Sequence, residues 1–152
     1  MTSCGLNGGP LADKGVYPAR IACNLWSAQG TCRYDQPFKK KLHPYFTQNG
    51  RDDNHNALQY IANMRDGSVA GFKYFMMQET NRISITVSGR GMGVMQVSDR
   101  EDFCMLAAEI PIRADRSECY SSASLCIQPG VHALYFRFRG CGAVNFHCFE
   151  LE

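Results

Sequence analysis

The residues of this 152-residue chain that could do chemistry are acids and histidines, and their positions match no catalytic pattern. A hydrolase needs a nucleophile with a base, or two opposed carboxylic acids. The chain has no Gly-x-Ser-x-Gly elbow. Its acids gather in expected loops, where a solvated surface is their ordinary role: Asp52, Asp53, Asp66, Asp99, Glu101 and Asp102. The histidines share no local motif, so we expect structural or exposed roles for them: His43, His55, His132 and His147.

The eight cysteines favour disulfides or buried thiols over a metal site. A zinc site is excluded by spacing, since there is no Cys-x-x-Cys and no close Cys/His quartet. An even number fits disulfides in an oxidising compartment, but it allows too many connectivities for the pairing to be deduced. Four of the cysteines lie in apolar, strand-like contexts, where a thiol packs as a small hydrophobe: Cys23, Cys104, Cys126 and Cys148. We expect buried thiols with one or two disulfides.

Composition favours one globular domain. The chain is 45% apolar and 11% aromatic, which is enough for a core. A net charge of +2 gives no argument for nucleic acid or an anionic membrane, and the only basic run is 39–41. No apolar stretch approaches the roughly 18 residues of a membrane helix, and the small, polar start carries no secretory signal. We expect a tail or linker over residues 1–17 and one domain over residues 18–152.

The elements that must position any site are short strands. Apolar and β-branched runs predict strands over 19–26, 69–77, 82–87, 93–97, 103–112 and 118–127, with another element starting at Leu58. Turn residues separate them, and residues 27–56 form a long loop of the kind that is often functional. Because no helical period is sustained, we predict an all-β fold, a β-sandwich of jelly-roll type.

The last stretch of the chain combines core residues with polar ones. Residues 130–138 and 144–151 are apolar runs separated by a glycine-containing segment at 139–142, which predicts two paired antiparallel strands. Alternation puts Val144, Phe146, Cys148 and Leu151 near the apolar face. Asn145 and His147 then point to the opposite face. We therefore expect the closing strand to help line a site.

These segments carry a family resemblance. The run Gln-Tyr-Ile-Ala-Asn-Met-Arg-Asp-Gly at 59–67, followed by Ala-Gly-Phe-Lys-Tyr-Phe at 70–75, resembles the Gly-Tyr-Ile-x-Asn-Gly-Asp segment and next strand of family 6 carbohydrate-binding modules. Residues 130–136 and 144–149 resemble the last two strands of that family. From Pro44 onward the chain is similar to the module at the C-terminus of family 43 glycoside hydrolases, which trim xylose and arabinose from hemicellulose. The resemblance covers about residues 18–152.

The resemblance implies a jelly-roll sandwich without catalytic machinery that holds sugar in a cleft at the loops joining its two sheets. In this family a sugar ring lies between aromatic side chains, and an Asn at the cleft floor hydrogen-bonds its hydroxyls. Tyr60 matches the cleft Tyr, and Asn145 matches the cleft Asn. Two plainer roles remain open: Tyr60 as a core residue with a satisfied hydroxyl, and Asn145 as the cap of a turn.

The sequence departs from the family pattern at three places. The second cleft aromatic, usually Trp, is missing, and Tyr120 is its expected substitute. Trp26, the only Trp, is a candidate core residue. The usual calcium-binding acids are replaced by Ala22, Asn24 and His147, so we expect no cofactor, because calcium prefers carboxylate oxygens to imidazole. The long loop offers two alternative aromatic platforms, Tyr45 and Phe46.

The resemblance therefore implies a noncatalytic module that binds xylan- or arabinoxylan-type β-linked glycans and targets an attached glycoside hydrolase. Its partners would be a polysaccharide or oligosaccharide and that catalytic domain, with no nucleic acid and no membrane. Such an enzyme works extracellularly or at a cell surface. The alternative is a structural accessory domain that packs on a glycosidase and has no sugar site of its own.

Overall fold

The computed structural model describes residues 8–31, 42–50 and 58–152, and this part of the chain is built almost wholly from strands. Its one helical element is a 3-10 turn, η1 (Ala19–Ile21). The strands are β1 (Gly15–Pro18), β2 (Asn24–Trp26), β3 (Tyr45–Gln48), β4 (Gln59–Met64), β5 (Val69–Met77), β6 (Arg82–Ser98), β7 (Ala108–Asp115), β8 (Cys119–Ser124) and β9 (Gly130–Leu151). The all-β prediction is confirmed.

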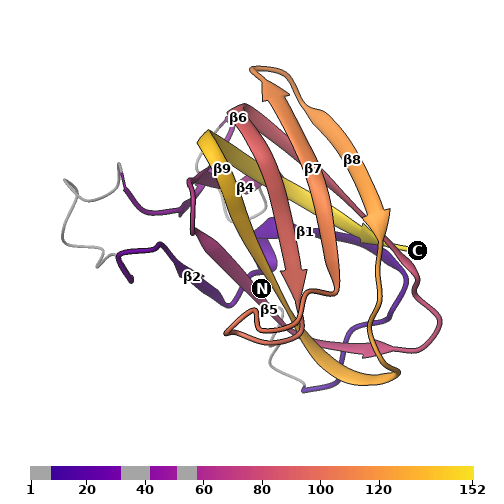
Figure 1. Ribbon diagram of the computed structural model, residues 1–152. Coiled ribbons are helices and arrows are strands. Elements are labelled where there is room, and N and C mark those ends of the chain that lie inside the picture. Colours follow the sequence, from indigo (N-terminus) through magenta and orange to yellow (C-terminus); the bar gives the residue numbers. More distant parts are fainter. Residues whose placement is uncertain (1–7, 32–41, 51–57) are drawn as a thin grey trace.

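The strands form two layers that share the long strands β6 and β9 (Figure 1). In the first sheet, β1 and β4 pair with the C-terminal arm of β9, which pairs with the N-terminal arm of β6, and β8 follows. Strand β3 lies at the edge beside β4. In the second sheet the order is β2, β5, the N-terminal arm of β9, the C-terminal arm of β6, and β7.

The predicted hairpin at the end of the chain is wrong, because residues 130–151 form one continuous strand. Its two halves pair with β6 and not with each other. Where both strands bend from one sheet into the other, glycine faces glycine: Gly93 lies opposite Gly140, and Gly91 lies opposite Gly142. A Cβ at Gly93 would overlap the carbonyl oxygen of Arg139. These glycines permit close backbone contact at a bend, and the same residues produced the false turn signals at 89–91 and 139–142.

The N-terminal segment also differs from the prediction. The expected strand over 19–26 is divided into η1 and β2, and β1 begins inside the stretch that was expected to be a tail. Leu11 is also tied to the sheet, since its N–H donates to the carbonyl of Tyr74. Strand β3 lies within the predicted long loop, most of whose other residues, 32–41 and 51–57, are outside the described residues.

Most other strands lie near their predicted positions. Strand β5 has the predicted bounds, and β4 and β8 begin within one residue of theirs. Strand β7 starts five residues later than expected, because Phe103 has a φ of 53° in the turn that precedes it. A left-handed φ is unfavourable for an aromatic residue and is incompatible with an extended strand.

The core is an aromatic cluster that joins the two sheets. Phe72 and Phe136 come from the second sheet, and Phe146 and Phe149 come from the first; all four are fully buried. The ring of Phe149 lies 4.9 Å from that of Phe72 and 4.8 Å from that of Phe136, centroid to centroid. Such edge-to-face and tilted contacts add to the free energy of burial. This cluster fixes both arms of β9 against one core.

A β-bulge in β9 changes which residues face that core. Thr86 pairs with Cys148, whereas the next residue of β6, Val87, pairs with Phe146, so His147 is the extra residue. The buried face is therefore Val144, Phe146, Phe149 and Leu151. The prediction that Cys148 shares it is wrong, because the bulge shifts the alternation by one residue.

The cysteines are less buried than expected. Cys104, Cys126 and Cys141 are exposed, and no disulfide joins two cysteines in the described ranges. The prediction of buried thiols is thus wrong for Cys104 and Cys126, which lie in turns beside the strands. Cys4 and Cys32 lie outside the described residues. Among the helices of the described segments, none is long and apolar enough to cross a membrane.

Candidate functional site

Two predicted site residues, Tyr60 and Asn145, lie in one polar cluster on the outer side of the first sheet, beside the bulge in β9. We call it the Tyr60 face and define it as Tyr60, Ser88, Asn145 and His147. The rings of Tyr60 and His147 lie 4.7 Å apart between centroids, tilted by 38°. Tyr60 is half-buried, so it is not a core residue, and its hydroxyl donates to Asn49 Oδ1 at 3.4 Å. The aromatic surface is thus a Tyr–His pair.

A chain of hydrogen bonds connects His147 to Asn145 through Ser88. His147 Nε2 lies 2.7 Å from Ser88 Oγ, and Asn145 Nδ2 donates to the same Oγ at 3.4 Å. The backbone N–H of Asn63 donates to Asn145 Oδ1 at 3.2 Å. Since a backbone N–H can only donate, it fixes the orientation of the Asn145 amide. Asn145 is therefore a positioned amide between two strands and not the cap of a turn.

The orientation of the Asn145 amide limits the hydrogen bonds that His147 can make through Ser88. Ser88 Oγ accepts from Asn145, and its hydroxyl can donate to Nε2 when that nitrogen is unprotonated. In that neutral tautomer Nδ1 carries the proton. Burial lowers the pKa of His147, which favours this neutral form, and the negative charge of Glu118 opposes part of that effect.

The backbone of β4 is irregular where it supports the site. The register between β4 and β9 shifts between Ile61 and Met64, and Asn63 has a φ of 61°. The Asn63 side chain stabilises this conformation, because its Nδ2 donates to the carbonyl of His43 at 3.1 Å and its Oδ1 accepts from Arg65 Nε at 3.0 Å. The irregularity frees the Asn63 N–H from the ladder, so it can bind Asn145.

Tyr120 lies on the same sheet as Tyr60 but at the other side of the polar residues. It is 61% exposed on β8 and pairs with Thr86 of β6. Strands β6 and β9 separate β8 from β4, so the two tyrosine backbones are about 14 Å apart at the usual strand spacing. Ser88 and His147 lie between them. The two tyrosines can therefore flank a ligand that lies over these polar residues.

The alternative aromatics, Tyr45 and Phe46, are on β3 at the edge of the sheet. Their exposed fractions are 37% and 48%, and they pair with Ala62 and Ile61 of β4. Phe46 also lines a shallow hollow with Thr47, Gln48 and Gln59. Alternation puts Tyr45 on the face of Tyr60 and Phe46 on the other. Of the two, Tyr45 can extend the Tyr60 face.

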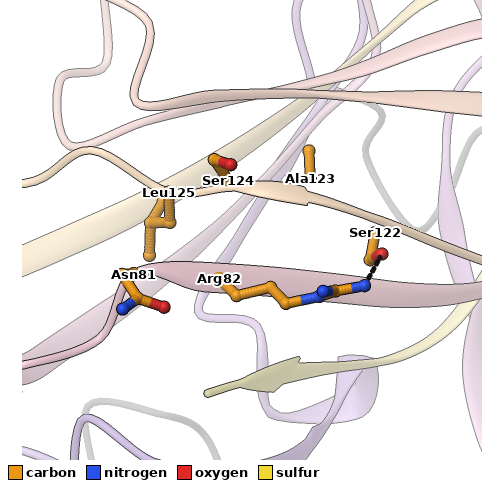
Figure 2. Close-up of a pocket in the computed structure, with 6 residues that line it drawn as sticks. All are labelled: Asn81, Arg82, Ser122, Ala123, Ser124 and Leu125. Atoms are coloured by element: carbon orange, nitrogen blue, oxygen red, sulfur yellow. Dashed lines mark hydrogen bonds between the residues drawn. The ribbon is translucent and has the colours of Figure 1, made fainter.

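A second hollow lies between the start of β6 and the end of β8 (Figure 2). Arg82 lies along it and donates from Nη2 to Ser122 Oγ at 2.8 Å. The rest of its lining is Asn81, Ala123, Ser124 and Leu125. It contains no aromatic ring, so it lacks the surface on which a pyranose could pack.

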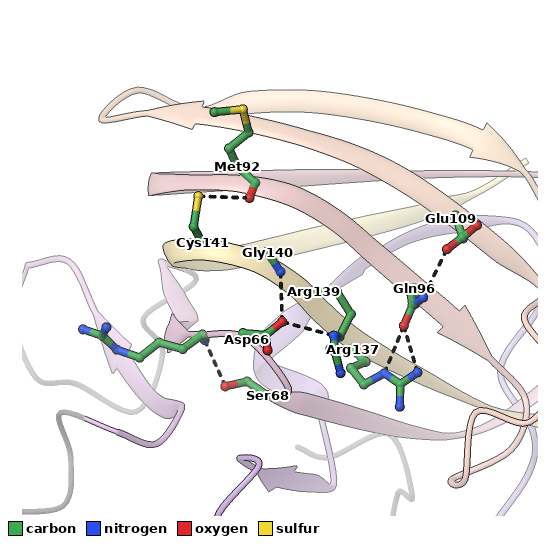
Figure 3. Close-up of polar contacts among 10 residues, drawn as sticks. Asp66, Ser68, Met92, Gln96, Glu109, Arg137, Arg139, Gly140 and Cys141 are labelled. Atoms are coloured by element: carbon green, nitrogen blue, oxygen red, sulfur yellow. Dashed lines mark hydrogen bonds and ion pairs between the residues drawn. The ribbon is translucent and has the colours of Figure 1, made fainter.

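Trp26 is on the second sheet, far from the Tyr60 face in the strand order. It is half-buried and packs on Tyr135, with 6.1 Å between ring centroids. Beside them Arg137 donates twice to Gln96 Oε1, and Gln96 donates to Glu109 (Figure 3). Trp26 therefore packs against a small buried cluster on the second sheet and is not the second aromatic beside Tyr60.

Two groups that hold Asn145 in place were not predicted from the sequence, Ser88 of the Tyr60 face and the backbone N–H of Asn63. Ser88 and the Asn63 N–H carry no local signal; the only hint was the alternation that points Asn145 and His147 to one side. In the described segments, no three His, Cys, Asp or Glu side chains are grouped so as to hold a metal ion.

Comparison with known proteins places this architecture. No family model matches the chain. The structure superposes on a family 6 module of Clostridium stercorarium solved with cellobiose, with a TM-score of 0.72 and 14% identity over 95% of this chain and 98% of that one. A β-1,3-glucan-binding family 6 module of Bacillus halodurans gives 0.72 and 13%, over 95% and 99%. The chain has the fold of a family 6 carbohydrate-binding module. The fold that the resemblance implied is confirmed.

The same fold occurs within larger enzymes. A family 43 arabinoxylan arabinofuranohydrolase of Bacillus subtilis matches with a TM-score of 0.65 and 13% identity, over 94% of this chain and 28% of that one. In sequence, the family 6-like chain is 38% identical over 153 aligned positions to a xylosidase/arabinosidase of Thermoclostridium stercorarium. This alignment covers 99% of the chain but only 32% of the relative. The chain thus spans about a third of the length of this relative.

Proposed function

We propose that the chain is a noncatalytic carbohydrate-binding module that holds an attached glycoside hydrolase on xylan- or arabinoxylan-type β-linked glycans. The observation that carries the proposal is the Tyr60 face, in which an aromatic ring and a backbone-anchored amide lie on one side of a rigid sheet. The proposal places the protein in an extracellular enzyme. It requires no metal or other cofactor.

The chemistry of the face suits a sugar. The face of a pyranose that presents C–H groups is apolar and packs on an aromatic ring, while its hydroxyls need donors and acceptors. Tyr60 supplies the ring, Asn145 supplies an amide fixed by Asn63, and Tyr120 can cover the ligand from the other side. The ligand would orient by few hydrogen bonds, so we expect weak binding. Attachment to an enzyme turns weak binding into a high local concentration on the polymer.

Two relatives support the glycan class. The sequence relative is a xylosidase/arabinosidase, and a structural neighbour is an arabinoxylan arabinofuranohydrolase. Other neighbours of the same fold were solved with cellobiose or xylose or bind β-1,3-glucan. A test must therefore include glucans beside xylans.

Affinity electrophoresis on soluble polysaccharides tests the proposal. The panel is arabinoxylan, glucuronoxylan, β-glucan, galactomannan and arabinan, and the proteins are wild type, Tyr60→Ala and Asn145→Ala. Tyr74→Ala is the matched control, because this tyrosine is half-exposed on β5 of the second sheet. We expect retardation on a xylan that both site variants lose and the control keeps.

Other outcomes are equally decisive. Retardation that survives both site substitutions would show that the glycan binds at another surface. Retardation on β-glucan alone would support glycan binding but show that the ligand is a glucan and not a xylan. No retardation on any polymer would contradict glycan binding.

The second candidate function is a structural accessory domain that packs on a catalytic domain. It is favoured by exposed apolar side chains in the segment between β6 and β7, where Met105 is 69% exposed and Leu106 is 39% exposed. A solvated monomer gains nothing from two such neighbours, whereas a domain interface would bury them. This function requires that the chain bind no polymer of the panel and that Met105→Ser with Leu106→Ser weaken its association with the catalytic part of the parent enzyme.

A further inference from the structure

We propose that His147 contacts the glycan at the Tyr60 face and makes glycan binding dependent on pH, with the neutral imidazole as the binding form. The inference rests on the proposed function, since it concerns the same site. It arises from the position of His147 at the bulge in β9, on the outer face of the sheet and against the ring of Tyr60.

The first step is the position of the ring. His147 is the unpaired residue of the bulge and lies on the same outer face as Asn145, where its side chain lies between Tyr60 and Ser88. A pyranose that packs on the Tyr60 ring and reaches the Asn145 amide must therefore cover the imidazole as well. His147 is a neighbour that no such ligand can avoid.

The second step is the direction of the hydrogen bonds. The Asn63 N–H orients Asn145, and Asn145 donates to Ser88. In the neutral tautomer with the proton on Nδ1, the Ser88 hydroxyl donates to His147 Nε2. His147 then presents Nδ1–H as the donor for a sugar hydroxyl. Protonation gives Nε2 its own hydrogen, so Nε2 no longer accepts from Ser88 and the Ser88 hydroxyl must rotate away. The polar network under the sugar would be rearranged.

The third step is the charge around the ring. The groups that titrate near His147 are Tyr60 on β4, Cys148 on β9 and Glu118 just before β8, while its contact on β6, Ser88, is neutral. Glu118 is thus the only nearby carboxylate among them, and it favours the imidazolium. A bound sugar removes water from the ring and carries no charge to replace it, so it favours the neutral form.

The sign of the effect follows from linkage. Burial already lowers the pKa of His147, and a covering sugar would lower it further. A ligand that lowers the pKa of a group binds the protonated protein more weakly, so protons and glycan compete. Affinity is then full at neutral pH and falls as the pH drops below the pKa of the free protein. If the bound glycan lowers the pKa of His147 by one unit, the affinity can fall by at most about tenfold at low pH.

The test is isothermal titration with xylohexaose, with cellohexaose as the alternative probe, at about pH 5 and about pH 7. We expect the wild type to bind several-fold to about tenfold more weakly at the lower pH. His147→Gln keeps a donor and an acceptor but cannot titrate there, so its Kd should be the same at both values. His132→Gln is the matched control, because His132 pairs with Asp99 at 3.1 Å near the start of β9 and outside the Tyr60 face. It should retain the pH dependence of the wild type.

A second readout follows the imidazole itself. The His147 proton signals in NMR spectra, assigned by their loss in His147→Gln, should titrate at a lower pH when xylohexaose is bound. Equal wild-type Kd values at both pH values, or a His147 titration that the sugar does not move, would overturn the inference while leaving glycan binding intact. If neither oligosaccharide binds at any pH, the proposed function fails and this inference falls with it.

Discussion

Replacing Gly93 with Ala should destabilise the protein strongly, because the backbones of β6 and β9 are in close contact at this glycine. A Cβ there would meet the carbonyl oxygen of Arg139 and lie 2.7 Å from the Cα of Gly140. Both are backbone atoms of the paired strand, so no side-chain rotation can relieve the overlap. Overpacking of a well-packed interior costs about 1–3 kcal/mol, and immovable backbone places this site at about 3 kcal/mol.

The loss is measurable as a shift of Tm. For a domain of this length, 1 kcal/mol corresponds to about 2–4 °C, so Gly93→Ala should melt about 6–12 °C lower. Gly9→Ala is the matched control, since a Cβ at Gly9 meets nothing within 4 Å. It should melt at the wild-type temperature or slightly higher. Calorimetry on the wild type, Gly93→Ala and Gly9→Ala measures these Tm values. A Gly93→Ala protein as stable as the control would refute the close backbone contact between β6 and β9 at this glycine.

Two further predictions concern the core and the effect of calcium. Phe149→Ala should lower the free energy of unfolding by about 3–5 kcal/mol, because its ring contacts Phe72 and Phe136 across both sheets; urea denaturation measures this, with the exposed Val16→Ala expected to change it by less than about 0.5 kcal/mol. A similar loss in both variants would contradict the role of the cluster. Calcium and EDTA should leave Tm unchanged, because Ala22 and His147 offer no carboxylate oxygen; a rise of several degrees with calcium would show a site that these residues do not explain.

The sequence by itself determined the local elements wherever one short segment carried the whole signal. The apolar run at β5 predicted its bounds, and the alternation around Asn145 predicted that this side chain faces away from the core. Both depend on the period of a strand, which a few neighbouring residues express. The order of the family-like segments was equally visible, and it led to the correct fold.

Only the tertiary structure decided how β6 and β9 are connected across the sandwich. Glycines at 140 and 142 give the same local signal in a turn as in a bent strand, and the distinction depends on Gly93 and Gly91 of another strand. Residues about fifty positions apart in the chain settle that choice. No window of the sequence contains both.

The candidate site divides in the same way. The sequence predicted Tyr60 and Asn145 from their resemblance to a family motif, and the structure places them on one sheet. The sequence alone could not predict the Tyr60–His147 contact or the role of Ser88, because both depend on a bulge and on the register between β6 and β9. Because Cys148 and Phe149 are both apolar, the sequence does not show where the alternation shifts until the partner strand is known. Residue types thus decided which chemistry was available, and pairing decided which side chains could share it.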